Sequence, residues 1–161
     1  MNSTGYWSQR MHKAETEQAL SRATADVLEK MFFTGVADES AAIPPAGSQI
    51  VVRLTFDGER RGVLTLGVSR RAAQTLAADF LGTDNEDGPD EIQVNEVVRE
   101  LANMICGDAL SALEKSALHL SMPEIVPAAD FVLPEGSRHR SFDLGDGALT
   151  VGLVFQGAAN G

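Results

Sequence analysis

The 161-residue sequence predicts an α+β domain, in which an antiparallel sheet carries long helices packed on one face. Two pairs of apolar segments flank turn sequences, an Asp-Gly pair at 57–58 and a Gly-Asp-Gly turn at 145–147, which are typical of β-hairpins. Residues 13–34 and 90–118 instead repeat their apolar side chains at helical spacing. Because the strands cluster in hairpins, a parallel sheet built from βαβ units is disfavoured.

The first long helix is expected over residues 13–34, with Gly35 as its stop. The polar residues before it, 1–12, are expected to form a loose N-terminal tail. Residues 13–156 would then make a single domain, and residues 157–161 a frayed C-terminus.

A hairpin and a short helix follow the first helix. Residues 49–56 place an apolar side chain at every second position, and residues 62–68 form the returning strand. Ser69 is expected to cap a helix over residues 70–81, which closes at Gly82. An acidic linker then leads to the second long helix.

The second long helix is expected to begin at Asp90, a favourable N-cap, and to continue to residue 118 without an internal proline. At about 100° per residue, one face is apolar and the other polar, and Glu100 and Asn103 are stacked on the polar face. Gly107 lies one turn further, where a missing side chain lets another backbone approach. The expected core stripe comprises Val94, Val98, Leu101, Ile105 and Ala112. The expected polar face comprises Glu96, Glu100, Asn103, Gly107, Leu110 and Glu114.

The C-terminal part of the chain is expected to be β-structure. Residues 123–133 contain two prolines, which exclude further helix and favour an extended segment. Residues 138–144 and 148–155 form the second hairpin across the Gly-Asp-Gly turn.

The composition narrows the range of partners. A net charge of −10 and the absence of a basic patch disfavour nucleic acid. The sequence has no run of 18 apolar residues, so no membrane span is expected, and its polar start is unlike a secretory signal. The single cysteine, Cys106, excludes an internal disulfide and favours a reducing cytoplasm, and we expect it to fill core space.

The sequence carries no familiar motif for metal, nucleotide or covalent chemistry. Its three histidines are scattered, and there is no P-loop, GxGxxG or GxSxG. Glu96 and Glu100 share a helix face, so acid–base work by a carboxylate pair stays open. By spacing alone, Glu100 and Asn103 are compatible either with solvated surface residues or with a functional site.

The segment 96–107, EVVRELANMICG, resembles the signature of the CheX/CheC/FliY family of chemotaxis phosphatases. That family carries a glutamate, two further residues and an asparagine on a long exposed helix, and Glu100 and Asn103 match these positions. The family has Asp or Ser four residues before the glutamate, whereas this chain has Glu96. A later proline of the motif could be supplied by one of the prolines at 123 and 127.

The resemblance extends over residues 13–156, where the order of elements is similar to a CheX-like or CheC-like domain. CheC-type relatives often carry a second motif in the first long helix. Here Glu29 could be its glutamate, but Phe32 replaces its asparagine. The resemblance therefore implies one site per chain, as in CheX-like proteins. CheX-type relatives also form dimers through their sheets, so the second hairpin, which is rich in Val, Leu and Phe, could offer an edge for a homodimer.

This resemblance implies a phosphatase that hydrolyses the aspartyl phosphate of a CheY-like response regulator. Asn103 would orient the attacking water, and Glu100 would pair with a lysine in the active site of the regulator. No cofactor of its own is implied, because the acyl phosphate and its Mg²⁺ belong to the partner. Gly107 would permit close approach, with Glu96 and Glu114 as further partner contacts.

Two other functions stay open at this point. The chain could be a non-catalytic CheX-like module that binds a receiver domain as a scaffold or sensor. It could also be a structural piece of a flagellar switch, although it has no extra segment that resembles a switch-ring domain.

Overall fold

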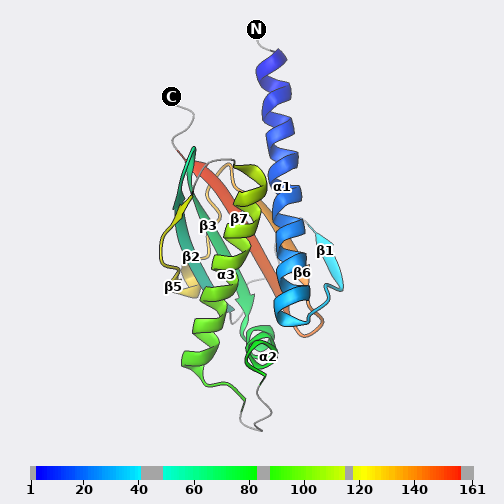
Figure 1. The fold of residues 1–161 in the computed structure, drawn as a ribbon, viewed down its shortest axis with the longest axis vertical. Coiled ribbons are helices and arrows are strands. Elements are labelled where there is room, and N and C mark those ends of the chain that lie inside the picture. Colours follow the sequence, from blue (N-terminus) through cyan, green and yellow to red (C-terminus); the bar gives the residue numbers. More distant parts are fainter. Residues whose placement is uncertain (1–2, 41–48, 83–87, 115–117, 157–161) are drawn as a thin grey trace.

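The structure is a computed structural model that describes residues 3–40, 49–82, 88–114 and 118–156. It has the predicted α+β architecture, with helices on one face of an antiparallel sheet (Figure 1). Its elements are, in chain order, α1 (Ser3–Phe32), β1 (Asp38–Ser40), β2 (Gln49–Asp57), β3 (Arg61–Ser69), α2 (Arg70–Leu81), α3 (Glu91–Leu113), β4 (His119–Leu120), β5 (Glu124–Val126), the 3-10 helix η1 (Ala128–Asp130), β6 (Arg138–Asp143) and β7 (Ala148–Gln156).

Within the described residues, seven strands form one sheet in the order β1-β6-β7-β3-β2-β4, and β5 pairs with β2. The two predicted hairpins, β2–β3 and β6–β7, meet in the middle of this sheet, where β3 pairs with β7. The last hairpin is therefore internal, because β7 has a strand on each side and β1 pairs with β6 at residues 141–143. The edge that we expected this hairpin to offer to a homodimer is largely occupied within the chain.

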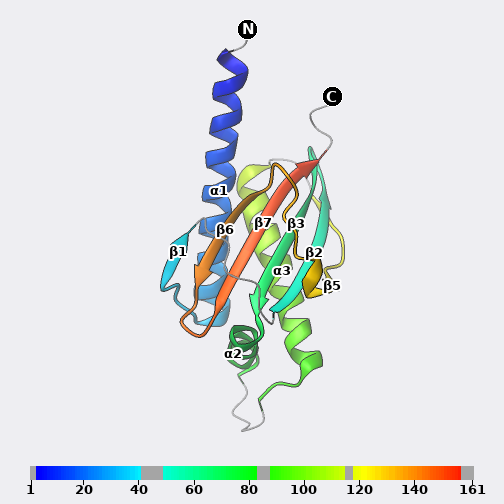
Figure 2. The ribbon, with the colours of Figure 1, turned by 180° about the vertical axis from the view of Figure 1, so that it is seen from behind.

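Helices α1 and α3 lie side by side over the sheet, and α2 lies near one end of both (Figures 1 and 2). Alternate side chains of the central strands point toward these helices and are buried against them. The strand side of this core comprises Ile50, Val52, Leu54, Phe56, Leu64, Leu66, Val68, Leu149, Val151 and Leu153. This packing fixes α3 firmly, since the helix buries nine side chains from Val94 to Leu110.

Both ends of α2 and the start of α3 confirm the predicted caps. Ser69 accepts a hydrogen bond from the amide of Ala72, and Gly82 closes α2 in the left-handed conformation with φ of 65°. Asp90 and Gln93 form a reciprocal capping box at the start of α3, with N···O distances of 2.8 and 2.9 Å. The start of the helix that carries the candidate site is therefore well defined.

The other face of the sheet is covered in part by the segment after β5. A methyl group on Gly67 would lie 3.1 Å from the ring of Phe131, and one on Gly152 would lie 2.4 Å from Leu133. These two glycines let the side chains of Phe131 and Leu133 rest on the strands.

Helix α1 differs from the prediction at both ends. It begins at Ser3, so residues 3–12 continue the helix and the expected loose tail is wrong for them. This stretch has no proline to stop the helix, which projects past the sheet (Figure 1). At its other end α1 stops at Phe32, because Phe33 and not Gly35 adopts the left-handed conformation, with φ of 54°. Phe33 is consequently exposed, whereas Phe32 is buried in the core.

Two further boundaries were missed. Residues 38–40 form the edge strand β1, where Glu39 accepts hydrogen bonds from Arg140 at 2.7 Å and from Ser21 at 2.8 Å. Helix α3 ends at Leu113, five residues earlier than expected. The double-proline loop, most of the acidic linker and the frayed C-terminus lie outside the described residues. No helix in the described ranges is long and apolar enough to cross a membrane.

Candidate functional site

The predicted site residues lie on the solvent side of α3. Glu96 and Glu100 are exposed, and Asn103 and Gly107 are half-buried one and two turns further along. Since α3 is regular throughout, Glu100 and Asn103 lie about 4.5 Å apart along the helix axis. The structure therefore brings a free carboxylate and a partly shielded carboxamide onto one patch. We call Glu96, Glu100, Asn103 and Gly107 the α3 patch.

The two glutamates of the α3 patch differ in their electrostatic surroundings. Glu96 pairs with Arg99, one turn along the helix, with an N···O distance of 2.7 Å. Glu100 has no ion-pair partner among the described residues. Glu100 is therefore the carboxylate of the patch that is available to an incoming cation.

Gly107 leaves open space on the helix. A methyl group at this position would meet one atom, Cδ1 of Leu120, at 4.0 Å, which is ordinary contact. Packing within the chain therefore does not require glycine here, although glycine costs about 1 kcal/mol relative to alanine in a helix. The presence of glycine at position 107 is therefore due either to a contact outside the described chain or to chance.

Glu114 does not belong to the exposed face, and its predicted role as a partner contact is corrected. It is 6% exposed and forms an ion pair with Arg60 at 3.0 Å, while Arg60 stacks on the ring of Phe155 at 3.8 Å. The backbone of Glu114 is already extended after α3 ends. Its carboxylate thus ties the helix end to the β2–β3 hairpin.

The same region shows where the helical wheel fails. Leu110 is buried although it was placed on the polar face, and Ala112 is exposed although it was placed in the core. The exposed stripe runs through Glu96 and Glu100 and then turns toward Asp108 and Ala112, because α3 crosses the strands at an angle (Figure 1). A fixed wheel cannot show this drift.

The described residues hold no cluster of three or more His, Cys, Asp or Glu side chains suited to a metal ion. Burial raises the pKa of the Cys106 thiol from 9.0 to about 12, so this thiol stays protonated at neutral pH and is a poor nucleophile. The α3 patch itself can accept, donate and orient hydrogen bonds. These residue types suit positioning and charge pairing more than nucleophilic attack.

The sequence was compared with models of protein families and with curated proteins. The family model described as chemotaxis phosphatase CheX matches residues 50–142, which include the whole of α3. No curated protein matches the sequence.

Solved structures share the fold. A CheX from Desulfovibrio desulfuricans has a TM-score of 0.69 at 19% identity, covering 88% of this chain and 99% of that one. The crystal structure of a CheX–CheY–BeF3–Mg²⁺ complex from Borrelia burgdorferi has a TM-score of 0.66 at 16% identity, covering 87% and 97%. FliY from Thermotoga maritima has a TM-score of 0.60 at 16% identity, covering 92% and 89%. At these identities the structures establish the fold.

Proposed function

The chain belongs to the CheX family of chemotaxis phosphatases, and from that premise we propose that it hydrolyses the aspartyl phosphate of a CheY-like response regulator. The observation that carries the proposal is the α3 patch, where Glu100 is exposed, has no ion pair with another described residue, and lies one turn before the half-buried Asn103. Both residues fall inside the region that matches the family model. A regulator of this kind acts in the cytoplasm, where we place this protein.

In the proposed reaction, a water molecule attacks the phosphorus in line with the bond to the aspartyl oxygen. The P–O bond breaks, the aspartate leaves as a carboxylate, and inorganic phosphate is released. This reaction depends on positioning and charge stabilisation more than on a nucleophile from the enzyme. The carboxamide of Asn103 accepts a hydrogen bond from the water and donates one to the phosphoryl oxygens, which holds the water in line.

Glu100 fixes the register of the two proteins. Its carboxylate is free to pair with a lysine beside the phosphoryl group of the regulator, and a charge-assisted bond of this kind is short and directional. The Borrelia complex contains CheY with BeF3, a stand-in for a phosphoryl group, together with Mg²⁺. By analogy we assign Mg²⁺ to the partner and no cofactor to this chain.

Gly107 and Glu96 complete the proposed contact. The open space at Gly107 allows a loop of the regulator to approach the helix. Glu96 is a rim contact whose charge is partly balanced by Arg99. Glu114 has no part in the contact, because its carboxylate is buried against Arg60.

The proposal is tested by phosphate release from a CheY-like receiver domain charged with acetyl phosphate. The wild-type protein should accelerate release, and Asn103→Ala should abolish most of that acceleration with the fold intact. Asn95→Ala is the matched control, since Asn95 is a half-buried asparagine of α3 outside the α3 patch. Full activity of the Asn103 variant would overturn the assignment.

A non-catalytic module that binds a receiver domain is the second candidate. Glu96 stands where the resemblance calls for Asp or Ser, and its ion pair with Arg99 changes the charge beside Glu100. The same assay separates the two functions, because a module binds the receiver without faster release of phosphate.

A further inference from the structure

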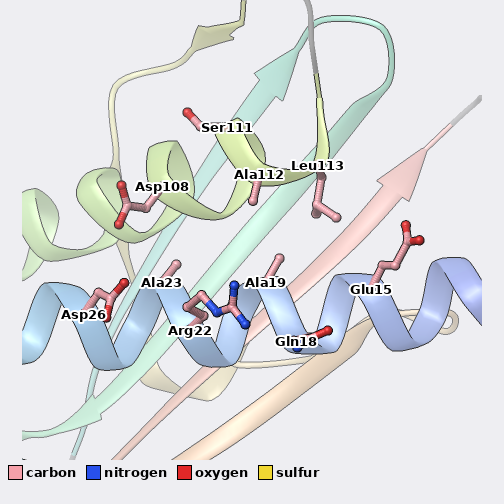
Figure 3. A pocket seen from close by; sticks show the side chains of 10 residues that line it. All are labelled: Glu15, Gln18, Ala19, Arg22, Ala23, Asp26, Asp108, Ser111, Ala112 and Leu113. Atoms are coloured by element: carbon pink, nitrogen blue, oxygen red, sulfur yellow. The ribbon is translucent and has the colours of Figure 1, made fainter.

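A groove lies between α1 and α3, outside the α3 patch. Its volume is about 590 Å³. Figure 3 shows side chains from both helices along it, with Asp26 of α1 and Asp108 of α3 at the same end. The lining residues used below are Glu15, Ala19, Arg22, Ala23, Asp26, Asp108 and Ala112.

The groove combines a small-residue floor with acidic walls. Three alanines, at positions 19, 23 and 112, lie along the groove together with Leu113. The walls carry three carboxylates, from Glu15, Asp26 and Asp108, against one guanidinium, from Arg22. Neither Asp26 nor Asp108 forms an ion pair with another described residue. The groove is therefore acidic, with carboxylates that the described chain leaves unpaired.

The groove begins further along α3 than most of the α3 patch, at Asp108. Glu100, Met104 and Asp108 follow one another at four-residue intervals, so they form one line along α3. Asp108 lies about 12 Å along the helix from Glu100. A domain of 100 residues has a radius of gyration of about 13 Å, so a partner centred on the α3 patch also reaches the groove.

The α3 patch alone is too small for a specific interface. A standard interface buries about 800 Å² on each partner and involves 20–30 residues, whereas the patch has four residues. We propose that the groove is the second half of the docking surface and binds a basic segment of the same receiver domain. This inference rests on the proposed function for the identity of the partner.

The charge and the shape of the groove both favour a basic segment as its occupant. Lysine and arginine side chains have long aliphatic stems, which can lie on the alanine floor while their charged ends reach Asp26 and Asp108. A second copy of this chain, with a net charge of −10, is repelled by the acidic walls. The groove therefore contributes to affinity and partner choice, and the α3 patch performs the chemistry.

The test compares two double variants that each remove two negative charges. Asp26→Asn/Asp108→Asn neutralises the groove, and Asp79→Asn/Glu135→Gln neutralises two exposed carboxylates elsewhere. For the acetyl-phosphate-charged receiver domain, the groove variant should raise KM about fivefold with kcat unchanged, and the control should change KM less than about twofold. Because the contact is ionic, added salt should shrink the difference.

Equal KM values for the two double variants, with wild-type phosphatase activity intact, would overturn the groove inference and leave the proposed function standing. If the wild-type protein does not accelerate phosphate release, the proposed function is wrong, and titration calorimetry of the same receiver domain against both variants decides the groove separately. Weaker binding by the groove variant alone would support it, whereas equal binding or no binding of any variant would contradict it.

Discussion

Glu100 and Asn103 lie one turn apart on α3 and have different surroundings, which matches the different roles that we propose for them. Glu100 is exposed and unpaired within the described chain, as a docking charge must be. Asn103 is half-buried, so its carboxamide has fewer orientations to lose when it positions a water molecule. The sequence predicted both positions from helical spacing, but their roles came from the family resemblance alone.

The substitution Gly107→Ala tests the role of a third residue of the α3 patch. Gly107→Ala should raise the free energy of unfolding by about 0.5–1 kcal/mol, because alanine favours the helix and meets ordinary contact here. The same change should weaken binding of the receiver domain if a loop of the partner uses the open space. Urea unfolding and a binding titration measure the two effects. A stabilised variant that binds normally would leave Gly107 without a functional role.

At the scale of elements, local signals predicted those ends of helices that are set by local chemistry. Ser69, Gly82 and Asp90 all cap as expected, since each cap depends on a few neighbouring residues. The end of α1 was missed because Phe33 adopts a conformation that glycine normally supplies. Strand β1 was missed because three polar residues pair through tertiary contacts of Glu39 with α1 and β6.

Tertiary contacts also explain why the exposed stripe on α3 drifts around the helix. Which side of a helix faces solvent depends on the elements that cross it, and a fixed wheel contains no such information. Glu114 shows the consequence, because its position on the wheel suggested an exposed partner contact while Arg60 holds it in the interior. The groove beside Asp108 was likewise invisible in the sequence, since its two walls come from helices far apart in the chain.

The ion pair between Glu114 and Arg60 should stabilise the junction of α3 with the β2–β3 hairpin. Glu114→Ala should lower the free energy of unfolding by about 2 kcal/mol, because it leaves a partly buried guanidinium without its partner. Glu59→Ala is the control, an exposed carboxylate in the same hairpin turn with no ion pair among the described residues. Equal stability of the two variants in urea would show that the pair contributes nothing.

At the scale of the whole molecule, one core joins the sheet to all three described helices, and Cys106 lies within it. The raised pKa of Cys106 links its ionisation to unfolding. Between pH 9.0 and about 12 the unfolded chain loses the thiol proton while the folded chain keeps it. This contribution to stability is therefore complete below pH 9 and is lost as the pH rises toward 12.

Unfolding experiments between pH 8 and 11 test this linkage. The wild-type protein should lose up to about 1.4 kcal/mol more per pH unit above pH 9 than Cys106→Ala does. Cys106→Ala should be less stable overall because it removes a buried sulfur, so the slope with pH is the informative quantity. Identical slopes would show that the thiol ionises equally in both states.

The sheet and the other helices pack against α3 and leave one of its faces toward solvent. The fold class, the hairpins and the capped helices were predictable because each depends on the spacing of residues close together in the sequence. The groove and the buried end of α3 depend instead on tertiary packing. The family model covers this same part of the molecule, because residues 50–142 contain α3 and most of the sheet that supports it.

We propose above all that Asn103 positions the water that attacks the phosphoryl group of a bound receiver domain. The most direct measurement is single-turnover decay of the phosphorylated receiver with the protein in excess, comparing wild type, Asn103→Ala and Asn95→Ala. We predict that Asn103→Ala binds the receiver normally and slows the decay by at least about 100-fold relative to wild type, while Asn95→Ala behaves as wild type. Decay at the wild-type rate with Asn103→Ala would contradict it.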